Sequence, residues 1–270
     1  MTSTQSASPE RPRGVDVLGT RVDDVTYEEA LALLRAAIQR RETLVVSTPN
    51  PEIVMAARAD SDYRAVLDRC GLNIPDGIGL LLAARIAGQP LREHVQGTDL
   101  VLRLAAESPT AGYRWFLLGG WGDTAERAAR ALERQFPGIR VVGWDPGSPD
   151  PADDAATREL VRAAGPVDVL LVAYGAPKQE RWLDRNQAAL GVPVGIGVGG
   201  VFAYIAGDVP RAPAWVRRIH FEWLHRLLTQ PRYRWRRQLR LPLFGILAIA
   251  EGLRRRKVAA ALSRRTAPRD

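Results

Sequence analysis

The chain has 270 residues, enough for one large domain or two small ones, with 46% hydrophobic and 25% charged residues. This balance is typical of a soluble globular protein and excludes a disordered, collagen-like or multi-span membrane chain. A single cysteine, Cys70, excludes an internal disulfide, and with only three histidines we expect no structural metal site. Residues 1–13 contain no apolar signal-peptide core, so we expect a disordered lead-in and a cytoplasmic protein.

The net charge of +8 is unevenly distributed along the chain. Residues 211–270 contain fifteen arginines and one lysine against three acidic residues, a net charge of +13, which leaves −5 for residues 1–210. A mildly acidic body thus carries a strongly basic C-terminal region. Such asymmetry predicts a polyanionic partner, which is nucleic acid, anionic lipid or a diphosphate.

From residue 14 to residue 210, apolar runs alternate with helical patterns. The apolar runs predict strands at Val15–Val22, Thr43–Ser47, Gly71–Ile74, Tyr113–Leu118, Ile139–Val142, Val167–Ala173 and Val192–Val198. Helices are predicted after the capping-box pair Thr26 and Glu29, and over Pro51–Ala59, Thr124–Phe136, Pro151–Ala164 and Lys178–Leu190. Strands this apolar, separated by helices, indicate a mostly parallel sheet covered on both faces. We therefore predict an α/β, Rossmann-like domain over residues 14–210.

The basic C-terminal region predicts two helices, Trp215–Thr229 and Tyr233–Lys257, the second containing an apolar run over Leu241–Ala250. Ten helical residues rise about 15 Å, whereas a bilayer core is about 30 Å thick, so this run cannot span a membrane. Because arginines flank it, the run suits a helix lying in the membrane interface. A last core helix with solvated arginines is the alternative. We predict a membrane-associating appendage over residues 211–257 and a disordered tail over 258–270.

Ligands of parallel α/β sheets bind beyond the carboxyl ends of the strands, and two of the predicted strand ends carry polar residues. Thr48 and Asn50 follow the strand that ends at Ser47, where they would contact a ligand or simply cap the helix that begins at Pro51. Asp76, followed by Gly77 and Gly79, is a candidate general base, although spacing alone favours an ordinary turn or N-cap aspartate.

Two further strand ends are glycine-rich. Tyr174–Glu180 opens a helix with Lys178, one of only two lysines, which is either functional or a solvated first-turn residue. Gly195–Gly200 matches G-x-G-x-x-G, but a dinucleotide fold requires a long helix next, and Gly207 ends this one early. The nicotinamide interpretation is therefore weak, whereas close approach of the backbone to a phosphate remains open.

Other candidate sites are less consistent with their surroundings. Asp60-Ser61-Asp62 has the D-x-D form of a metal-binding glycosyltransferase motif, but it falls in a helical stretch, so we interpret it as a solvated helix junction. His94, His220 and His225 lack ligand spacing with an acidic partner. Cys70 is predicted to be a buried thiol.

Taken in order, these segments resemble the WecG/TagA/CpsF family, glycosyltransferase family 26. The resemblance covers residues 14 to 240, and the ordered set of motifs is specific although each is weak alone. The matching stretches are Thr48–Glu52, Pro75–Gly79, Gln96–Leu100, Phe116–Gly120, Gly175–Glu180, Gly197–Gly200, Ala206-Gly207, Arg211–Pro213, Glu222–Leu227 and Pro231-Arg232.

The resemblance implies an inverting, metal-independent hexosyltransferase without a cofactor, peripheral on the inner face of the cell membrane. It would transfer an N-acetylmannosamine-type sugar, its uronic acid or a glucose-like hexose from a UDP-sugar to a polyprenyl-diphosphate-linked saccharide, in cell-surface polysaccharide synthesis. Asp76 would be the general base, with Thr48 beside it. The implied substrate-binding residues are Asn50, Gly77, Gly79, Gln179, Gly197, Gly199, Gly200, Arg211, Arg226, Arg232 and Arg236. The four arginines in this set would face the negative charge of the substrate diphosphates. This role agrees with the net charge of +13 over residues 211–270.

One residue departs from the family pattern. The family usually reads V-G-G-S-F-D after the glycine-rich turn, and the position of its aspartate is occupied here by Ala203. We therefore expect altered nucleotide contacts.

Two rival functions are an NAD(P)-dependent oxidoreductase using Gly195–Gly200 and a non-catalytic module that binds anionic lipid or RNA through the basic region. Trp223, Tyr233 and Trp235 could stack on bases, but a nucleic-acid binder would not need the turn at Pro75–Gly79. We therefore expect no nucleic-acid partner. The sequence is compatible with a homo-oligomer.

Overall fold

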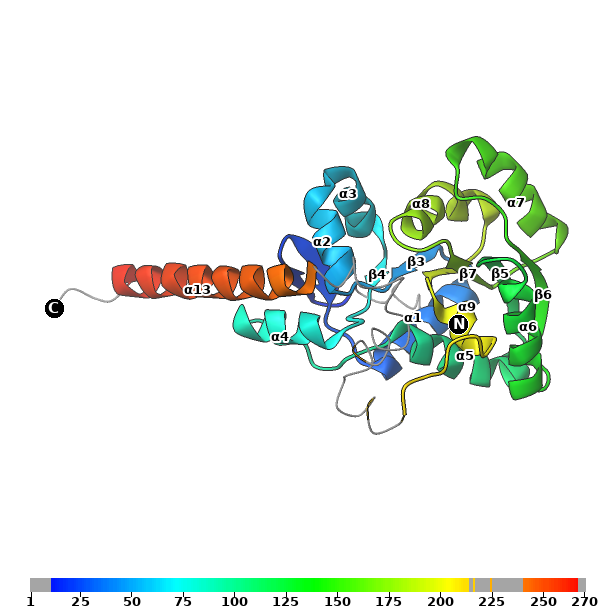
Figure 1. The fold of residues 1–270 in the computed structure, drawn as a ribbon, viewed down its shortest axis with the longest axis horizontal. Helices are drawn as coiled ribbons and strands as arrows, with labels where there is room; N and C mark the ends of the chain where they lie inside the picture. The colour runs from blue at the N-terminus through cyan, green and yellow to red at the C-terminus, as the bar shows by residue number, and fades with distance from the viewer. Residues whose placement is uncertain (1–10, 214–215, 217–223, 225–239, 267–270) are drawn as a thin grey trace, which may run out of the picture.

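Six parallel strands form the centre of the computed structural model, which describes residues 11–213, 216, 224 and 240–266 (Figure 1). In sheet order they are β4 (Leu72–Asn73), β3 (Leu44–Ser47), β8 (Val194–Gly197), β7 (Val169–Ala173), β5 (Arg114–Gly119) and β6 (Arg140–Asp145). Because all six are parallel, their carboxyl ends share one edge of the sheet. The predicted α/β fold with a parallel sheet is confirmed.

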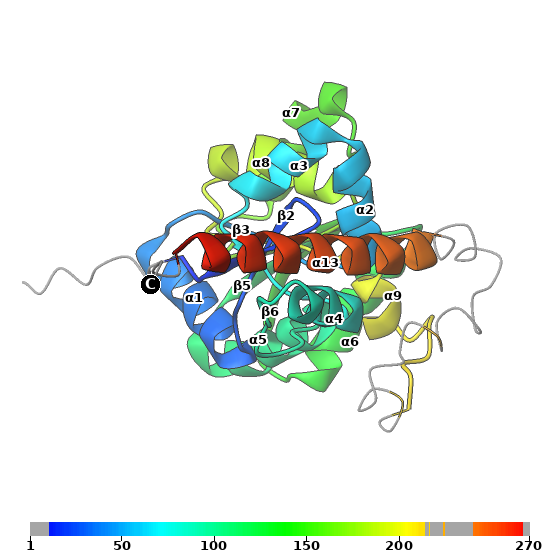
Figure 2. The same ribbon diagram turned by 90° about the vertical axis from the view of Figure 1, so that its left-hand side faces the viewer.

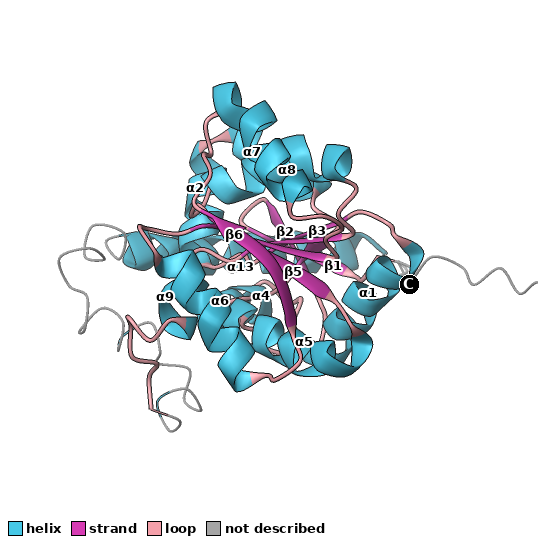
Figure 3. Ribbon diagram, turned by 90° about the vertical axis from the view of Figure 1, so that its right-hand side faces the viewer, coloured by secondary structure: helices cyan, strands magenta, loops and turns pink. Residues whose placement is uncertain are grey.

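Helices cover both faces of this sheet (Figure 3). One layer contains α1 (Tyr27–Arg40), α5 (Gly97–Ala111), α6 (Thr124–Gln135) and α9 (Val201–Ile205). The other contains α7 (Asp154–Ala163), which follows the short 3-10 helix η1 (Pro151–Asp153), and α8 (Lys178–Leu190), with α2 (Pro51–Ala59) and α3 (Ser61–Arg69) beside it. The sequence predicted this arrangement because strands that are apolar on both faces need cover on both.

The strand β5 shows how the apolar runs produce this core. Trp115 and Leu117 point into the α1–α5–α6 side, whereas Phe116 and Leu118 pack against the α7–α8 side. All four are at most 2% exposed. The indole N–H of Trp115 donates to Ser108 Oγ at 2.9 Å, so its one polar atom is satisfied inside the core.

Part of the N-terminal prediction was wrong, because Val15–Val22 is a hairpin rather than one strand. The antiparallel strands β1 (Gly14–Val17) and β2 (Thr20–Asp23) are joined by a two-residue turn in which Leu18 and Gly19 both have positive φ, 52° and 85°. A turn of that kind matches the right-handed twist of a hairpin. The apolar pattern continues through Leu18, which concealed the turn.

The C-terminal helix α13 (Arg240–Thr266) lies across α4 (Ile78–Ile86) and α2, as Figures 1 and 2 show. Phe244 and Ala248 are buried in a cluster with Leu80 of α4. At Gly252, a Cβ would lie 2.4 Å from Ile86 Cγ2, so glycine allows the two helices to approach. One face of the helix therefore joins the core, as in the core-helix alternative, and its other face is exposed, while membrane association stays a prediction.

Within the part of the chain that the structure describes, no helix has the length and apolarity needed to cross a bilayer. Most of the predicted helix Trp215–Thr229 and the start of the predicted helix Tyr233–Lys257 lie outside the described residues. The described helix continues past residue 257 to Thr266. The domain boundary at residue 211 stays a prediction.

Candidate active site

Asp76 lies just beyond β4, and backbone and side-chain bonds fix its position. Its N–H donates to the carbonyls of Pro49, at 3.0 Å, and Ile74, at 2.9 Å, which ties it to the turn after β3. Its Oδ2 accepts the N–H of Gly97, the first residue of α5, at 3.1 Å. This bond orients the carboxylate against the start of α5.

Gly97 was not among the predicted site residues, yet it brings the start of α5 against Asp76. A Cβ on Gly97 would lie 2.9 Å from Thr48 Cγ2, closer than side chains tolerate, and 3.3 Å from Asp76 Oδ2, which would have to shift by a few tenths of an ångström. Glycine is therefore required for this approach. The available signal was its place in the motif Gln96–Leu100.

Thr48 connects the same site to β8. Its hydroxyl donates to the carbonyl of Gly197 at 3.2 Å, and the side chain is buried. Since β4, β3 and β8 are neighbours in the sheet, Asp76, Thr48 and Gly197 come from three successive strand ends. The structure thus brings together three residues that are far apart in the sequence.

The other polar residue after β3, Asn50, caps α2. Its Oδ1 accepts the N–H of Ile53 at 3.0 Å, with Pro51 at the first helical position, as in ordinary capping. Gly77 and Gly79 lie against this helix start, where added Cβ atoms would be 3.2 Å and 2.7 Å from the ring of Pro51. These glycines therefore let the starts of α2 and α4 meet.

Gln179 lies at the start of α8 and is 2% exposed. Its Oε1 accepts the N–H groups of Gly175, at 3.1 Å, and Gly199, at 2.8 Å. Its Nε2 donates to Glu180 Oε1 at 2.8 Å. The side chain of Gln179 also fills the space beside Gly197, since a Cβ on Gly197 would lie 2.9 Å from Gln179 Nε2. Gly200 is exposed at the end of this turn.

The same packing argues against a dinucleotide site at Gly195–Gly200. A Cβ on Gly195 would lie 2.1 Å from Oε1 of Gln187, so side chains of α8 occupy the space that the first two glycines leave. The following helix α9 has only five residues. A dinucleotide fold needs a long helix at this point.

Glu180 and Tyr63 form a buried polar pair that the sequence analysis did not single out. Glu180 is fully buried, and its Oε2 accepts the hydroxyl of Tyr63, from α3, at 3.0 Å. Burial raises the pKa of the Glu180 carboxyl, although hydrogen bonds from Gln179 and Tyr63 offset part of the effect. No motif pointed to Tyr63, because its partner lies 117 residues away.

Arg211 is held by a residue at the start of α5. Its guanidinium pairs with Asp99, two residues after Gly97 in the first turn of the helix. Its Nε is buried and has no hydrogen-bond partner among the described residues. The other predicted arginines, Arg226, Arg232 and Arg236, lie outside the described residues.

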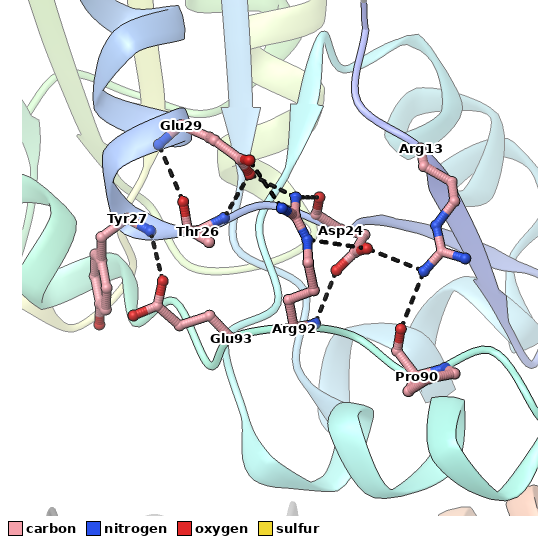
Figure 4. Close-up of polar contacts among 8 residues, drawn as sticks. All are labelled: Arg13, Asp24, Thr26, Tyr27, Glu29, Pro90, Arg92 and Glu93. Atoms are coloured by element: carbon pink, nitrogen blue, oxygen red, sulfur yellow. Dashed lines mark hydrogen bonds and ion pairs between the residues drawn. The ribbon is translucent and has the colours of Figure 1, made fainter.

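The loop before α5 is held by a network of charged residues (Figure 4). Arg92 donates to Asp24 and to both oxygens of Glu29, the latter at 2.9 and 2.6 Å. Glu29 also completes the predicted capping box with Thr26, which is confirmed. The hydroxyl of Tyr27 accepts the N–H of Gln96 at 2.8 Å, so these contacts fix the loop up to the residue before Gly97.

An exposed tryptophan stands at the carboxyl end of β5. Trp121 is 86% exposed, although Thr124 holds its carbonyl through two hydrogen bonds, of 3.1 Å from the backbone N–H and 2.6 Å from the hydroxyl. Its loop lies beside the end of β7, since Gly120 N–H donates to the carbonyl of Ala173 at 3.2 Å. Sequence reasoning overlooked this residue, which composition alone does not distinguish from a core tryptophan.

The remaining candidates have structural roles. Asp60 ends α2 and caps α3 by accepting the N–H of Tyr63, and it pairs with Arg181; these contacts lower the pKa of its carboxyl. The helix-junction interpretation is confirmed. Cys70 is buried, and burial raises the pKa of its thiol. Among the described residues, no cluster of three or more His, Cys, Asp or Glu side chains has the arrangement of a metal site.

Comparison with known proteins identifies the family. The model for "Glycosyl transferase WecG/TagA/CpsF family" matches residues 15–258. A Bacillus subtilis protein named N-acetylglucosaminyldiphosphoundecaprenol N-acetyl-beta-D-mannosaminyltransferase is 32% identical over 79% of this chain and 82% of its own length. Proteins of the same name from Bacillus spizizenii and Staphylococcus aureus are 34% and 28% identical, over 74% and 92% of this chain and 76% and 95% of their own lengths. The chain belongs to the WecG/TagA/CpsF family and is a glycosyltransferase, a hexosyltransferase of cell-surface polymer synthesis.

Proposed function

We propose that this enzyme transfers N-acetylmannosamine from a UDP-sugar to N-acetylglucosamine carried on undecaprenyl diphosphate. The observation that carries the proposal is the Asp76 carboxylate, oriented by Gly97 beside Thr48 at the carboxyl edge of the sheet. The names of relatives that cover most of the chain at about 30% identity supply the sugar and the acceptor.

Asp76 acts as the general base in this proposal. It removes the proton from the acceptor hydroxyl as that oxygen attacks the anomeric carbon and the bond to UDP breaks. With an α-linked donor, a β-linked product requires attack from the opposite face, so a single base and a stabilised leaving group suffice. Thr48 lies beside Asp76 with its hydroxyl committed to Gly197 and limits the space on that side.

The donor lies along the carboxyl edge from β3 toward β5. Adjacent strands are about 4.8 Å apart, so three strand spacings span about 14 Å, the scale of an extended nucleotide sugar. The diphosphate would then face the turns after β8 and β7, and the nucleoside would reach the loop of Trp121. Ala203 lies on α9, just after the turn that follows β8, at the position where the family usually has an aspartate.

UDP leaves with diphosphate charge that this enzyme must neutralise. Arg211 supports this role, because it pairs with Asp99 in the same first turn of α5 whose Gly97 N–H bonds Asp76. We assign Arg226, Arg232 and Arg236 to the same task on the strength of the family resemblance. In this proposal no divalent metal takes part, so transfer is expected to persist in EDTA.

The enzyme acts as a peripheral protein on the inner face of the membrane, where its acceptor is anchored. Supporting this, α13 exposes a stripe of large apolar side chains on the face opposite Phe244. The stripe consists of Leu243, Ile246, Ile249 and Leu253, between 48% and 64% exposed. Large exposed apolar stripes are rare on surfaces that face only water, and an anionic bilayer would also attract the +13 region.

A donor screen tests the proposed function. The enzyme would be given UDP-linked N-acetylmannosamine, its uronic acid, N-acetylglucosamine and glucose, with a short-chain prenyl-diphosphate N-acetylglucosamine as acceptor. We expect a β-linked disaccharide product from UDP-N-acetylmannosamine. Transfer of only another hexose would reject the sugar assignment, and absence of transfer from every donor would reject the donor and acceptor classes.

A further inference from the structure

Gln179 holds two glycine turns together through one oxygen. Its Oε1 accepts from Gly175 in the turn after β7 and from Gly199 in the turn after β8, at 3.1 and 2.8 Å. These turns belong to adjacent strands of the sheet. The buried side chain of Gln179 therefore links the two turns and fixes the distance between them.

The orientation of this carboxamide follows from hydrogen-bond chemistry. Backbone N–H groups only donate, so the oxygen of Gln179 must face Gly175 and Gly199, and its NH₂ must face Glu180. Glu180 in turn accepts from Gln179 with one oxygen and from Tyr63 with the other, at 2.8 and 3.0 Å. A continuous chain of bonds thus runs from α3 to both turns.

We propose that Gln179 and Glu180 are positioning residues for the donor diphosphate, and that neither touches it. Their polar atoms are occupied by the protein, with Gln179 2% exposed and Glu180 fully buried. They act by fixing the turns whose backbone faces the diphosphate. This inference rests on the proposed function, which places a UDP-sugar at these turns.

The network permits a test by exchange of the two residues. In Gln179→Glu, two buried carboxyl groups would meet at hydrogen-bond distance, and they stay together only while they share one proton. At a pH where both ionise, their like charges repel and one of them is displaced. In the double variant Gln179→Glu/Glu180→Gln, the carboxylate at 179 accepts from both turns and from the new amide. The new amide oxygen still accepts from Tyr63, so every bond is restored without a carboxamide at position 179.

The experiment measures the Kd for UDP by calorimetry, together with melting temperature, for the wild type, Gln179→Glu and the double variant. Gln187→Met is the matched control. Gln187 is another buried glutamine of α8, but it donates to the carbonyls of Leu44, Val192 and Pro193 rather than to either turn. We expect Gln179→Glu to weaken UDP binding at least about tenfold, and the double variant to return within about threefold of the wild type. Gln187→Met should lower the melting temperature and leave the Kd of the folded protein unchanged.

Each result has a defined meaning. Loss of UDP binding in the double variant as in Gln179→Glu would show that the carboxamide itself contacts the ligand, and would overturn the inference. Unchanged binding in Gln179→Glu at a pH where both carboxyls ionise, or equal weakening in Gln187→Met, would also overturn it. If Gln179→Glu does not fold, wild-type affinity in the double variant still supports the inference. Failure of the wild type to bind UDP would instead reject the proposed donor.

Discussion

At the scale of single residues, the site depends on how closely α5 approaches Asp76. Gly97 has Thr48 on one side and Asp76 on the other, within 3.3 Å of any added Cβ. We predict that Gly97→Ala displaces the carboxylate and lowers kcat at least about tenfold, because small misplacements of a catalytic group are costly. Steady-state transfer assays would check this.

Gly245→Ala is the matched control for that substitution, since a Cβ at Gly245 of α13 meets nothing within 4 Å. It should leave kcat unchanged. Wild-type kcat in Gly97→Ala would mean that the contact between α5 and Asp76 has no part in the reaction.

Trp121 provides a second prediction at this scale. The backbone of Trp121 is fixed, and its indole, 86% exposed, offers a flat face on which a nucleobase can stack. Stacking of one base on an aromatic side chain contributes about 1–3 kcal/mol to the free energy of binding. Trp121→Ala should therefore weaken UDP binding by about 5- to 150-fold, and Trp121→Phe by less. Trp144→Ala, at another exposed tryptophan, should leave the affinity unchanged, so equal effects at both positions would refute the assignment.

The sequence pointed to some site residues and not to others, for a physical reason. Asp76 and Thr48 follow predicted strands, and the carboxyl ends of parallel strands share an edge, so their proximity could be predicted. Tyr63 and Glu180 meet only because α3 packs beside α8. No local spacing reports such a contact. The buried contacts of Gln179 also became evident only from the packing of α8, whereas capping by Asn50 was one of the two roles that the sequence had left open.

At the scale of elements, the buried carboxyl between α3 and α8 predicts a dependence of stability on pH. Burial raises the pKa of Glu180 above its ordinary value of 4.5, so the folded state holds this proton more tightly than the unfolded state. The stability that this provides is complete below pH 4.5 and is lost as the pH rises through the folded pKa. Glu180→Gln lacks this titration.

We therefore expect the free energy of unfolding of the wild type, minus that of Glu180→Gln, to fall as the pH rises from 4.5 to 7. Other groups titrate in both proteins and cancel in the difference. Denaturant unfolding at several pH values would measure it. A difference that increases with pH would show that the folded state favours the carboxylate.

Long apolar runs identified most strands, because they need no partner to be recognised. The residues between Gly77 and Gly112 gave no such pattern, and α4 and α5 were not predicted. The hairpin was missed because Leu18 keeps the apolar run continuous through the turn. Pattern reasoning fails where a turn is apolar or a helix has apolar residues on several sides, as Leu80 and Leu82 of α4 illustrate.

At the scale of the whole molecule, α13 connects the catalytic body to the proposed membrane surface. Arg255 pairs with Glu251 on its own helix and with Asp16 of β1, so the helix is held by charge as well as by Phe244. The opposite face remains apolar and exposed. We predict that Ile246→Ser/Ile249→Ser lowers partitioning onto anionic liposomes at high salt, where charge attraction is screened.

The expected loss is about tenfold or more, because partly burying one such side chain contributes more than about 1 kcal/mol. Leu160→Ser, at an exposed leucine of α7, is the control. Transfer to a soluble short-chain acceptor should be unaffected in both variants. Undiminished salt-resistant binding of the double variant would reject α13 as the membrane contact.

The central claim is that Asp76 is the base of an inverting transfer, and Asp76→Asn tests it most directly. An asparagine oxygen can still accept the N–H of Gly97, so the geometry is kept while the basic group is removed. Rates would be measured with UDP-N-acetylmannosamine and a short-chain prenyl-diphosphate N-acetylglucosamine, alongside the Kd for UDP. We predict a loss of about 10²–10⁴-fold in kcat with UDP affinity within about threefold of the wild type. Transfer by Asp76→Asn at a rate near that of the wild type would contradict the account.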